Sequence, residues 1–211
     1  MMPAMSTMFS PDEAAAVVRA LRERRTVGPL RFDAGQKPDH EVILEAIESA
    51  RWAPNHKRTE PWRFYLLGAD KIARLADVNA ERMQNTGTAP ERIELKHAEW
   101  NSTPGVMIML CQHAPEHSDI LRQENYAACA AAAQNFQLHL FAHGIASKWS
   151  TAACWDLPSF WELLGLDGQP ENSEPVGIFF YGIPASQPTP MRHLSTAEIV
   201  TDSTEPAAAA S

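Results

Sequence analysis

The chain has 211 residues, of which 45% are hydrophobic, and a net charge of −8 from 18 basic and 26 acidic residues. This length suits one domain with a sizeable core, and the hydrophobic fraction excludes wholesale disorder. The acidic balance argues against a nucleic-acid partner, because nonspecific binding of nucleic acid needs a basic surface.

The N-terminus lacks the charged-then-apolar pattern of a signal peptide, so we expect a cytoplasmic protein. No stretch approaches the roughly 20 apolar residues of a membrane-spanning helix, which argues against a membrane partner. Three scattered cysteines are too few for a disulfide framework. We expect one domain over residues 1–211, with flexible tails at 1–10 and about 202–211.

The first half of the chain is predicted to contain mostly helices. Ser10-Pro11-Asp12-Glu13 supplies an N-cap, a first-turn proline and acidic residues, so a helix begins there and ends near Arg25. Apolar residues at helical spacing predict a second helix from about Pro38 to Arg51. Three elements follow in order: a strand over 63–68, a helix opening at 69–70 and a more polar helix ending near Trp100.

The second half begins with VMIMLCQ (106–112), a continuous apolar run typical of a strand buried on both faces. Residues 118–143 form the longest predicted helix, and its many alanines would let another helix approach closely, as at the centre of a fold or a dimer interface. The rest comprises a strand at 146–151, a helix at 158–164, a strand at 175–184 and an extended arm. The irregular order predicts an α+β layer fold, with a few strands covered by helices.

Several familiar catalytic motifs are missing from the sequence. There is no GxxxxGK[ST] phosphate loop, no GxGxxG dinucleotide fingerprint and no GxSxG nucleophile elbow. The sequence therefore argues against a P-loop enzyme, a Rossmann dehydrogenase and the usual type of serine hydrolase.

Two histidine pairs have the i, i+4 spacing that lets imidazoles share a metal ion: His139 with His143, and His113 with His117. The glutamate of an HExxH motif is missing, and the sequence offers no third ligand near His139 and His143. His143 also fits the C-terminus of a helix, where a cation is stabilised. We therefore expect no metal, and a metal-binding protein built on His139 and His143 stays a lesser alternative.

Two polar stretches could bind a small molecule. Arg24, Arg25 and Thr26 end the first helix, and guanidinium groups suit phosphate, although such a cluster is more often only solvated charge. In KWST (148–151), Ser150 and Thr151 could hydrogen-bond a heterocycle while Trp149 packs beside it, but a strand end with a buried tryptophan explains this stretch equally well.

In their order along the chain, four stretches together resemble the nitroreductase family of flavoproteins, and its short members in particular. They are RRT (24–26) followed by Leu30-Arg31-Phe32, APNHKRTEPWRF (53–64), GIASKWST (144–151) and VGIFFYGIP (176–184). The resemblance covers about residues 14 to 200. It implies a small central, mostly antiparallel sheet covered by helices, in an intertwined homodimer with FMN at the subunit interface.

The resemblance also implies roles for nine residues. Arg24, Arg25 and Thr26 would hold the FMN phosphate and ribityl chain, and Arg192 would also serve the phosphate. Trp52 and His56 would reach the flavin from the partner subunit, and Trp149, Ser150 and Thr151 would lie beside the isoalloxazine ring. Arg58 and Glu60 stand where many relatives have Asn and Gln.

The implied activity is ping-pong hydride transfer from NADH or NADPH, through the flavin, to a nitroaromatic, a quinone or a similar electron-poor acceptor. The flavin carries this chemistry, so no side chain has to act as a nucleophile or general base. Lys148, Ser150 and Thr151 are candidates for stabilising the reduced ring. The alternative is an FMN-binding sensor or carrier without NAD(P)H turnover.

Overall fold

The protein is described by a computed structural model that covers residues 9–189 and 191–201. The predicted tails at 1–10 and about 202–211 lie outside the described residues, except for Phe9 and Ser10. Ser10 is the N-cap of the first helix, α1 (Pro11–Glu23), as predicted, and it forms a capping box: its hydroxyl accepts from the Glu13 amide, and the Glu13 carboxylate accepts from the Ser10 amide.

The fold is α+β, as predicted, and its sheet has four antiparallel strands in the order β1-β2-β4-β3. The strands are β1 (Trp62–Leu67), β2 (Gly105–Gln112), β3 (Ala146–Ser150) and β4 (Ser173–Gly182). The central pair, β2 and β4, contributes the most buried side chains, as the unbroken apolar run of β2 predicts.

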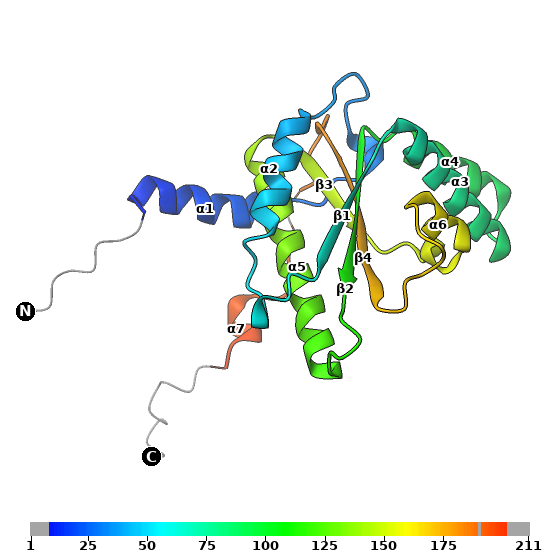
Figure 1. The fold of residues 1–211 in the computed structure, drawn as a ribbon. Helices are drawn as coiled ribbons and strands as arrows, with labels where there is room; N and C mark the ends of the chain where they lie inside the picture. The colour runs from blue at the N-terminus through cyan, green and yellow to red at the C-terminus, as the bar shows by residue number, and fades with distance from the viewer. Residues whose placement is uncertain (1–8, 190, 202–211) are drawn as a thin grey trace, which may run out of the picture.

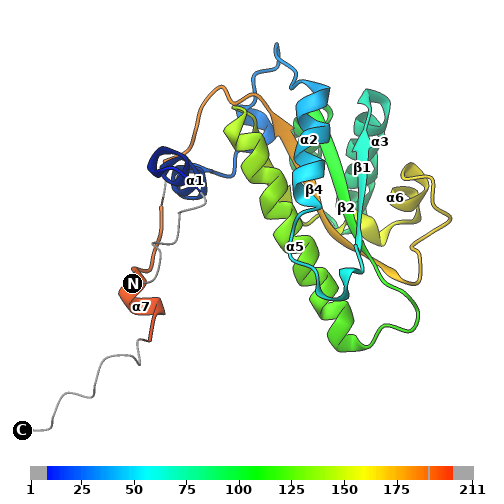
Figure 2. The same ribbon diagram turned by 60° about the vertical axis from the view of Figure 1, so that its left-hand side comes forward.

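Helices cover both faces of the sheet and make three layers (Figures 1 and 2). One face carries α2 (His40–Ala50) and α5 (Asp119–Ala142). The other face carries α3 (Ala69–Asn85), α4 (Pro90–Asn101) and α6 (Pro158–Leu163). Alternate residues of β2 serve the two cores: Ile108 faces α3 and α6, whereas Met107 and Met109 face α2 and α5.

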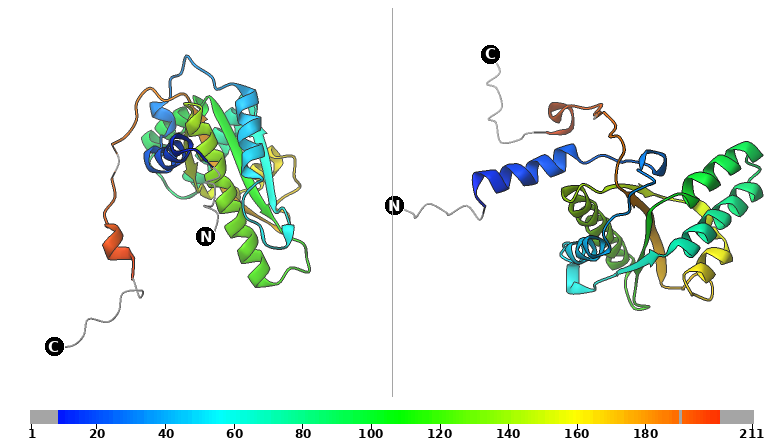
Figure 3. Two further views of the ribbon diagram at one scale, coloured as in Figure 1. Left: turned by 90° about the vertical axis from the view of Figure 1, so that its left-hand side faces the viewer. Right: turned by 90° about the horizontal axis from the view of Figure 1, so that it is seen from above.

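Short elements complete the chain. They are the 3-10 helices η1 (Pro29–Arg31), η2 (His56–Arg58) and η3 (Ala153–Asp156), and the helix α7 (Thr196–Ile199). The predicted extended arm after Ala185 therefore contains one helical turn, which Ser195 and Glu198 cap. Figures 2 and 3 show α1 and this C-terminal arm standing away from the layered body.

Candidate functional site

The segment after α1 is hydrogen-bonded to the edge of the sheet. Thr26 forms an isolated parallel bridge with Ser147, and the Val27 amide donates to the Ser147 carbonyl at 3.1 Å. Phe32 then bridges to Pro184, beyond the end of β4. These bonds fix the end of α1 beside β3, so two stretches that are about 120 residues apart in the sequence share one edge of the sheet.

Arginines gather at the end of α1. Burial, followed by the charges of Arg192 and Arg25, lowers the pKa of Arg24. The Nε and Nη1 atoms of Arg24 and the Nε atom of Arg25 are buried without a hydrogen-bond partner among the described residues. Among the described residues, no carboxylate lies within 4.0 Å of the guanidinium groups of Arg24, Arg25 and Arg192.

Buried, unpaired cationic donors are costly, and an anion that accepts from them removes that cost. A hollow of about 510 Å³ opens beside the cluster, lined by Leu21, Arg22, Arg25, Met191 and Arg192. The arrangement therefore suits a phosphate or a carboxylate. Arg192 belongs to this cluster although it lies in the C-terminal arm, far from Arg24 in the sequence.

Along β3, the predicted ring-binding residues divide into two groups. Trp149 packs inward: its ring stacks on Phe179 at 5.3 Å between centroids, and its indole N–H donates to the Val176 carbonyl at 2.9 Å. Ser150 and Thr151, together with Lys148, line a hollow of about 240 Å³ that faces α3 and α4. Trp149 can therefore contribute packing to a ligand site, whereas Lys148, Ser150 and Thr151 can contribute polar groups.

The arginine cluster and the Ser150 hydroxyl lie along the same edge strand. Thr26 pairs with Ser147, and Ser150 is three residues further on, which is about 10 Å at the rise of a strand. An elongated ligand with an anionic end could contact both groups.

Trp52 and His56 lie on the loop between α2 and β1. Trp52 is 81% exposed, and the Nδ1–H group of His56 donates to the Glu124 carboxylate of α5 at 2.6 Å. Three residues of this loop, Lys57, Arg58 and Glu60, have φ values of 57°, 53° and 45°. Residues other than glycine rarely adopt this left-handed backbone conformation, so surrounding hydrogen bonds must hold the loop in place.

Those bonds come from residues that the sequence analysis missed. Asn55 accepts from the Glu60 amide at 2.8 Å, and the Thr59 hydroxyl donates to Asn125 of α5 at 2.6 Å. Asn125 is fully buried and also contacts the Nδ1 atoms of His117 and His113, at 3.2 and 3.4 Å. Asn125 stands at helical spacing with Leu121, Ala128 and Cys129, and a polar residue on such an apolar stripe was the signal that could have revealed this support.

The structure does not bring together all of the predicted site residues. His56 contacts Glu124 near the start of α5, whereas Thr26 pairs with Ser147 just beyond its end. From Glu124 to Ala142 the helix rises by about 27 Å. Within one chain, His56 is therefore far from the arginine cluster, whereas Trp52 follows Ser49, which contacts Asn135 and His139 in the last part of α5.

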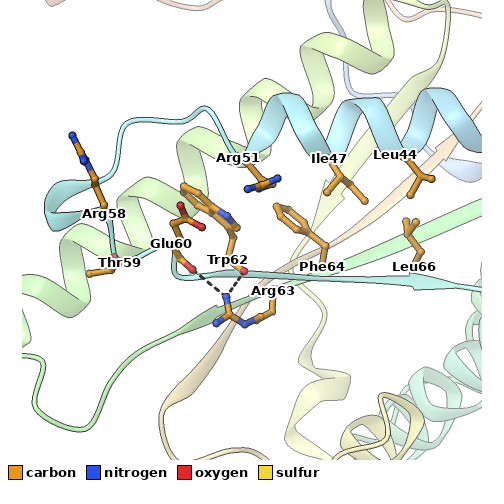
Figure 4. A pocket seen from close by; sticks show the side chains of 10 residues that line it. All are labelled: Leu44, Ile47, Arg51, Arg58, Thr59, Glu60, Trp62, Arg63, Phe64 and Leu66. Atoms are coloured by element: carbon orange, nitrogen blue, oxygen red, sulfur yellow. Dashed lines mark hydrogen bonds between the residues drawn. The ribbon is translucent and has the colours of Figure 1, made fainter.

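A further pocket of about 790 Å³ lies between α2 and β1 (Figure 4). Ile47 and Leu44 of α2 face Phe64 and Leu66 of β1 across it, and Arg58 and Glu60 stand at one end. None of the nine predicted site residues lines this pocket. It runs beside the outer edge of β1, which pairs only with β2 in the described part of the chain.

The nitroreductase family model matches residues 21–183, which is most of the chain. The chain therefore belongs to the nitroreductase family, as its motifs predict. The Bacillus subtilis (strain 168) protein named "Putative NAD(P)H nitroreductase YfhC" is 26% identical over 182 residues, covering 82% of this chain and 89% of its own.

Solved structures show the same fold. A nitroreductase-like family protein from Bacillus cereus has a TM-score of 0.73 and 27% identity, covering 96% of this chain and all of its own. The nitroreductase NfnB from Mycobacterium smegmatis, described as FMN-dependent and solved with NADPH, has a TM-score of 0.68 and 18% identity over 90% of this chain and 99% of its own. A nitroreductase from Desulfovibrio desulfuricans, solved with FMN, has a TM-score of 0.69 and 18% identity over 94% of this chain and all of its own.

These comparisons confirm the predicted family and fold class. The nine site residues remain predictions. Among the described residues, no helix is long and apolar enough to cross a membrane.

Proposed function

We propose that the protein is an FMN-dependent NAD(P)H oxidoreductase that reduces electron-poor acceptors such as nitroaromatic compounds or quinones. Family membership supports this activity, as do the names of the relatives, which include NAD(P)H nitroreductases and structures containing FMN or NADPH. The single observation that carries the proposal for this chain is the arginine cluster, with its buried and unpaired N–H groups.

The residues present fit the cofactor. Arg24, Arg25 and Arg192 would hold the FMN phosphate, because their guanidinium groups lack an internal counter-ion among the described residues. Thr26 would hydrogen-bond the ribityl chain. Ser150 and Thr151 stand further along the same strand edge, where they would meet the polar edge of the ring system.

Bound FMN supplies the redox chemistry, in which hydride equivalents pass from NAD(P)H to the acceptor. The residues of the chain would bind the cofactor, orient it and shield it from solvent. Lys148, Ser150 and Thr151 would place a cation and two hydroxyl donors where negative charge develops on reduction. Trp149 would act as a packed support for these groups, because its own N–H already bonds Val176.

The functional unit would be an intertwined homodimer. Within one chain α5 separates His56 from the arginine cluster, so His56 can reach the arginine half of a site only from a second chain, and we assign Trp52 of the same loop to that chain as well. Two exposed apolar surfaces favour such a dimer. The helix α1 buries none of its residues, and its Val17, Val18 and Leu21 are 43–51% exposed. The arm exposes Met191, Leu194, Ile199 and Val200.

An absorption spectrum of the purified protein, followed by anaerobic addition of NADH and then NADPH, tests this proposal. We expect a flavin spectrum that bleaches on addition of at least one donor and returns with an electron-poor acceptor. A flavin spectrum that stays unbleached with both donors would indicate a sensor or carrier instead. A colourless protein that does not bind added FMN would overturn the proposal.

A further inference from the structure

Three side chains that can bind metal converge where α2 packs on the end of α5. They are Glu45 of α2, His139 in the last turn of α5 and His143 just after it, and one ligand atom of each lies within 4.8 Å of the others. The Glu45 Oε2 atom is 3.9 Å from the Nε2 atom of His139. The sequence around the histidines offered no third ligand, whereas the fold supplies one from 94 residues earlier in the chain.

Hydrogen bonds leave the Nε2 atom of each histidine available. The Nδ1 atom of His143 is 3.0 Å from the His139 carbonyl, which can only accept, so Nδ1 carries the proton and Nε2 keeps its lone pair. The Nδ1 atom of His139 is 2.8 Å from the Ser49 hydroxyl, and its Nε2 atom is buried without a hydrogen-bond partner among the described residues. Histidines that bind metal are usually oriented in this way through their other nitrogen.

His139 also favours the neutral imidazole, the form that binds a metal. The rings of His139 and His143 stack, with centroids 4.5 Å apart and planes 14° from parallel, so two positive charges would repel each other there. Burial, and then the charge of His143, lowers the pKa of His139, while Glu45 opposes that shift.

We propose that Glu45, His139 and His143 bind one divalent transition-metal ion, with Zn²⁺ the best match to two imidazoles and a carboxylate. A tetrahedral ion with bonds of about 2.0–2.1 Å holds its ligands about 3.3 Å apart. Glu45 therefore has to move closer to His139 by about 0.6 Å, which its 65% exposed side chain permits. Parallel rings cannot both point at one ion, so the exposed His143 has to tilt.

Such an ion would clamp α2 to the end of α5. It would act on helix packing, and it is independent of the proposed flavin chemistry, because none of the three ligands belongs to the arginine cluster or to β3. A fourth coordination position would remain for water.

The test is a calorimetric titration of the tag-free, chelator-treated full chain with Zn²⁺, with Co²⁺ as a spectroscopic probe of coordination. His143→Ala and Glu45→Gln remove exposed ligands, and His97→Ala and Glu94→Gln are matched controls on α4, at the opposite face of the sheet. We expect one Zn²⁺ per chain, and a loss of at least about 10-fold in affinity in either ligand variant. The controls should bind Zn²⁺ as the wild type does.

Zn²⁺ should also raise the thermal midpoint of the wild type and of both controls, and do so less for the two ligand variants. Flavin content, measured in parallel, should be equal in all five proteins, which separates this test from that of the proposed function. Absence of Zn²⁺ binding by the wild type would overturn the proposal. Equal binding by the wild type and the ligand variants, or equal losses in the controls, would overturn it as well.

Discussion

The backbone N–H of Val27 donates a hydrogen bond of 3.1 Å to the carbonyl oxygen of Ser147. This bond joins the arginine-rich end of α1 to the start of β3. As a result, the phosphate-binding candidates Arg24 and Arg25 share one sheet edge with Ser150 and Thr151. The polar half of the proposed site is thus built by one chain, from two segments that lie far apart in the sequence.

Removing the two adjacent arginines should weaken FMN binding. Each hydrogen bond between charged groups contributes about 1.5–3 kcal/mol, so Arg24→Ala/Arg25→Ala should lower FMN affinity by roughly 100-fold or more. The protein without flavin should be no less stable, because burial and like charges disfavour the charged form of Arg24. Fluorescence titration with FMN checks this, with the exposed Arg19→Ala as a control that should bind normally. Unchanged affinity in the double variant would contradict the phosphate assignment.

The apolar face of α1 should hold the dimer together. Val17→Glu/Leu21→Glu places charges on side chains that are both 51% exposed in one chain, so the monomer should fold while the dimer dissociates. Light scattering coupled to size-exclusion chromatography measures the mass. Leu95→Glu on α4, where the side chain is 73% exposed, is the control and should stay dimeric. A dimer that survives the double change would place the interface elsewhere.

Gly177 makes room for Trp149. A Cβ atom at Gly177 would lie 2.1 Å from the Trp149 Nε1 atom, so Gly177→Ala should displace the indole and break its bond to Val176. We expect the free energy of unfolding to fall by about 1–3 kcal/mol, measured by denaturant unfolding. Gly28→Ala is the control, because its new Cβ would meet only Lys148 Cδ at an ordinary 3.7 Å. Equal stability of the two variants would show that Trp149 is not held in this way.

The loop of Trp52 and His56 should depend on the hydroxyl of Thr59. Thr59→Val keeps the side-chain shape but removes the bonds of the hydroxyl to Asn125 and Asn55, which costs about 1 kcal/mol for each bond and loosens the strained loop. Limited trypsin digestion should then cut after Lys57 or Arg58 faster than in the wild type. Thr86→Val removes only bonds to the carbonyls of its own helix and should leave the rate at this loop unchanged. If cleavage in Thr59→Val is as slow as in the wild type, other bonds hold the loop.

Tyr181 should make stability fall in alkaline solution. Burial raises its pKa from 10.0 to about 12, so the unfolded chain loses the phenolic proton first as the pH rises. The folded state is then disfavoured progressively between pH 10 and 12, by roughly 3 kcal/mol at the upper end. Denaturant unfolding of Tyr181→Phe should show a shallower fall than the wild type over that range. Parallel curves would contradict this assignment.

Much of the fold could be predicted from the sequence because its signals are local. The capping residues at Ser10, the apolar run of β2 and the alanines of α5 each define an element without reference to the rest of the chain. The start of β4 at Ser173, two residues before the predicted start at residue 175, was harder to predict. Ser173 and Glu174 are polar, and only their pairing with Gln112 and Cys111 makes them part of a strand.

The site was less predictable, because it depends on contacts between distant residues. The motifs marked Arg24 and Thr26, but only the bridge to Ser147 places them beside β3. Asn125 and Glu45 lie within helices, and the spacing of apolar residues in a helix does not predict which distant side chains contact them. The loop from Asn55 to Glu60 was recognised as part of a family motif, whereas its left-handed backbone follows from the bonds to Asn55 and Asn125.

The central claim is that one flavin site is built from two chains, and mixed dimers test it most directly. One chain carries Arg24→Ala/Arg25→Ala, the other carries Trp52→Ala/His56→Ala, and the heterodimer is isolated through two different tags. Because one site of the heterodimer then keeps both unmodified halves, we predict about one tightly bound FMN per heterodimer and very little in either mutant homodimer. A heterodimer without FMN, or a Trp52→Ala/His56→Ala homodimer with full flavin content, would contradict the shared site.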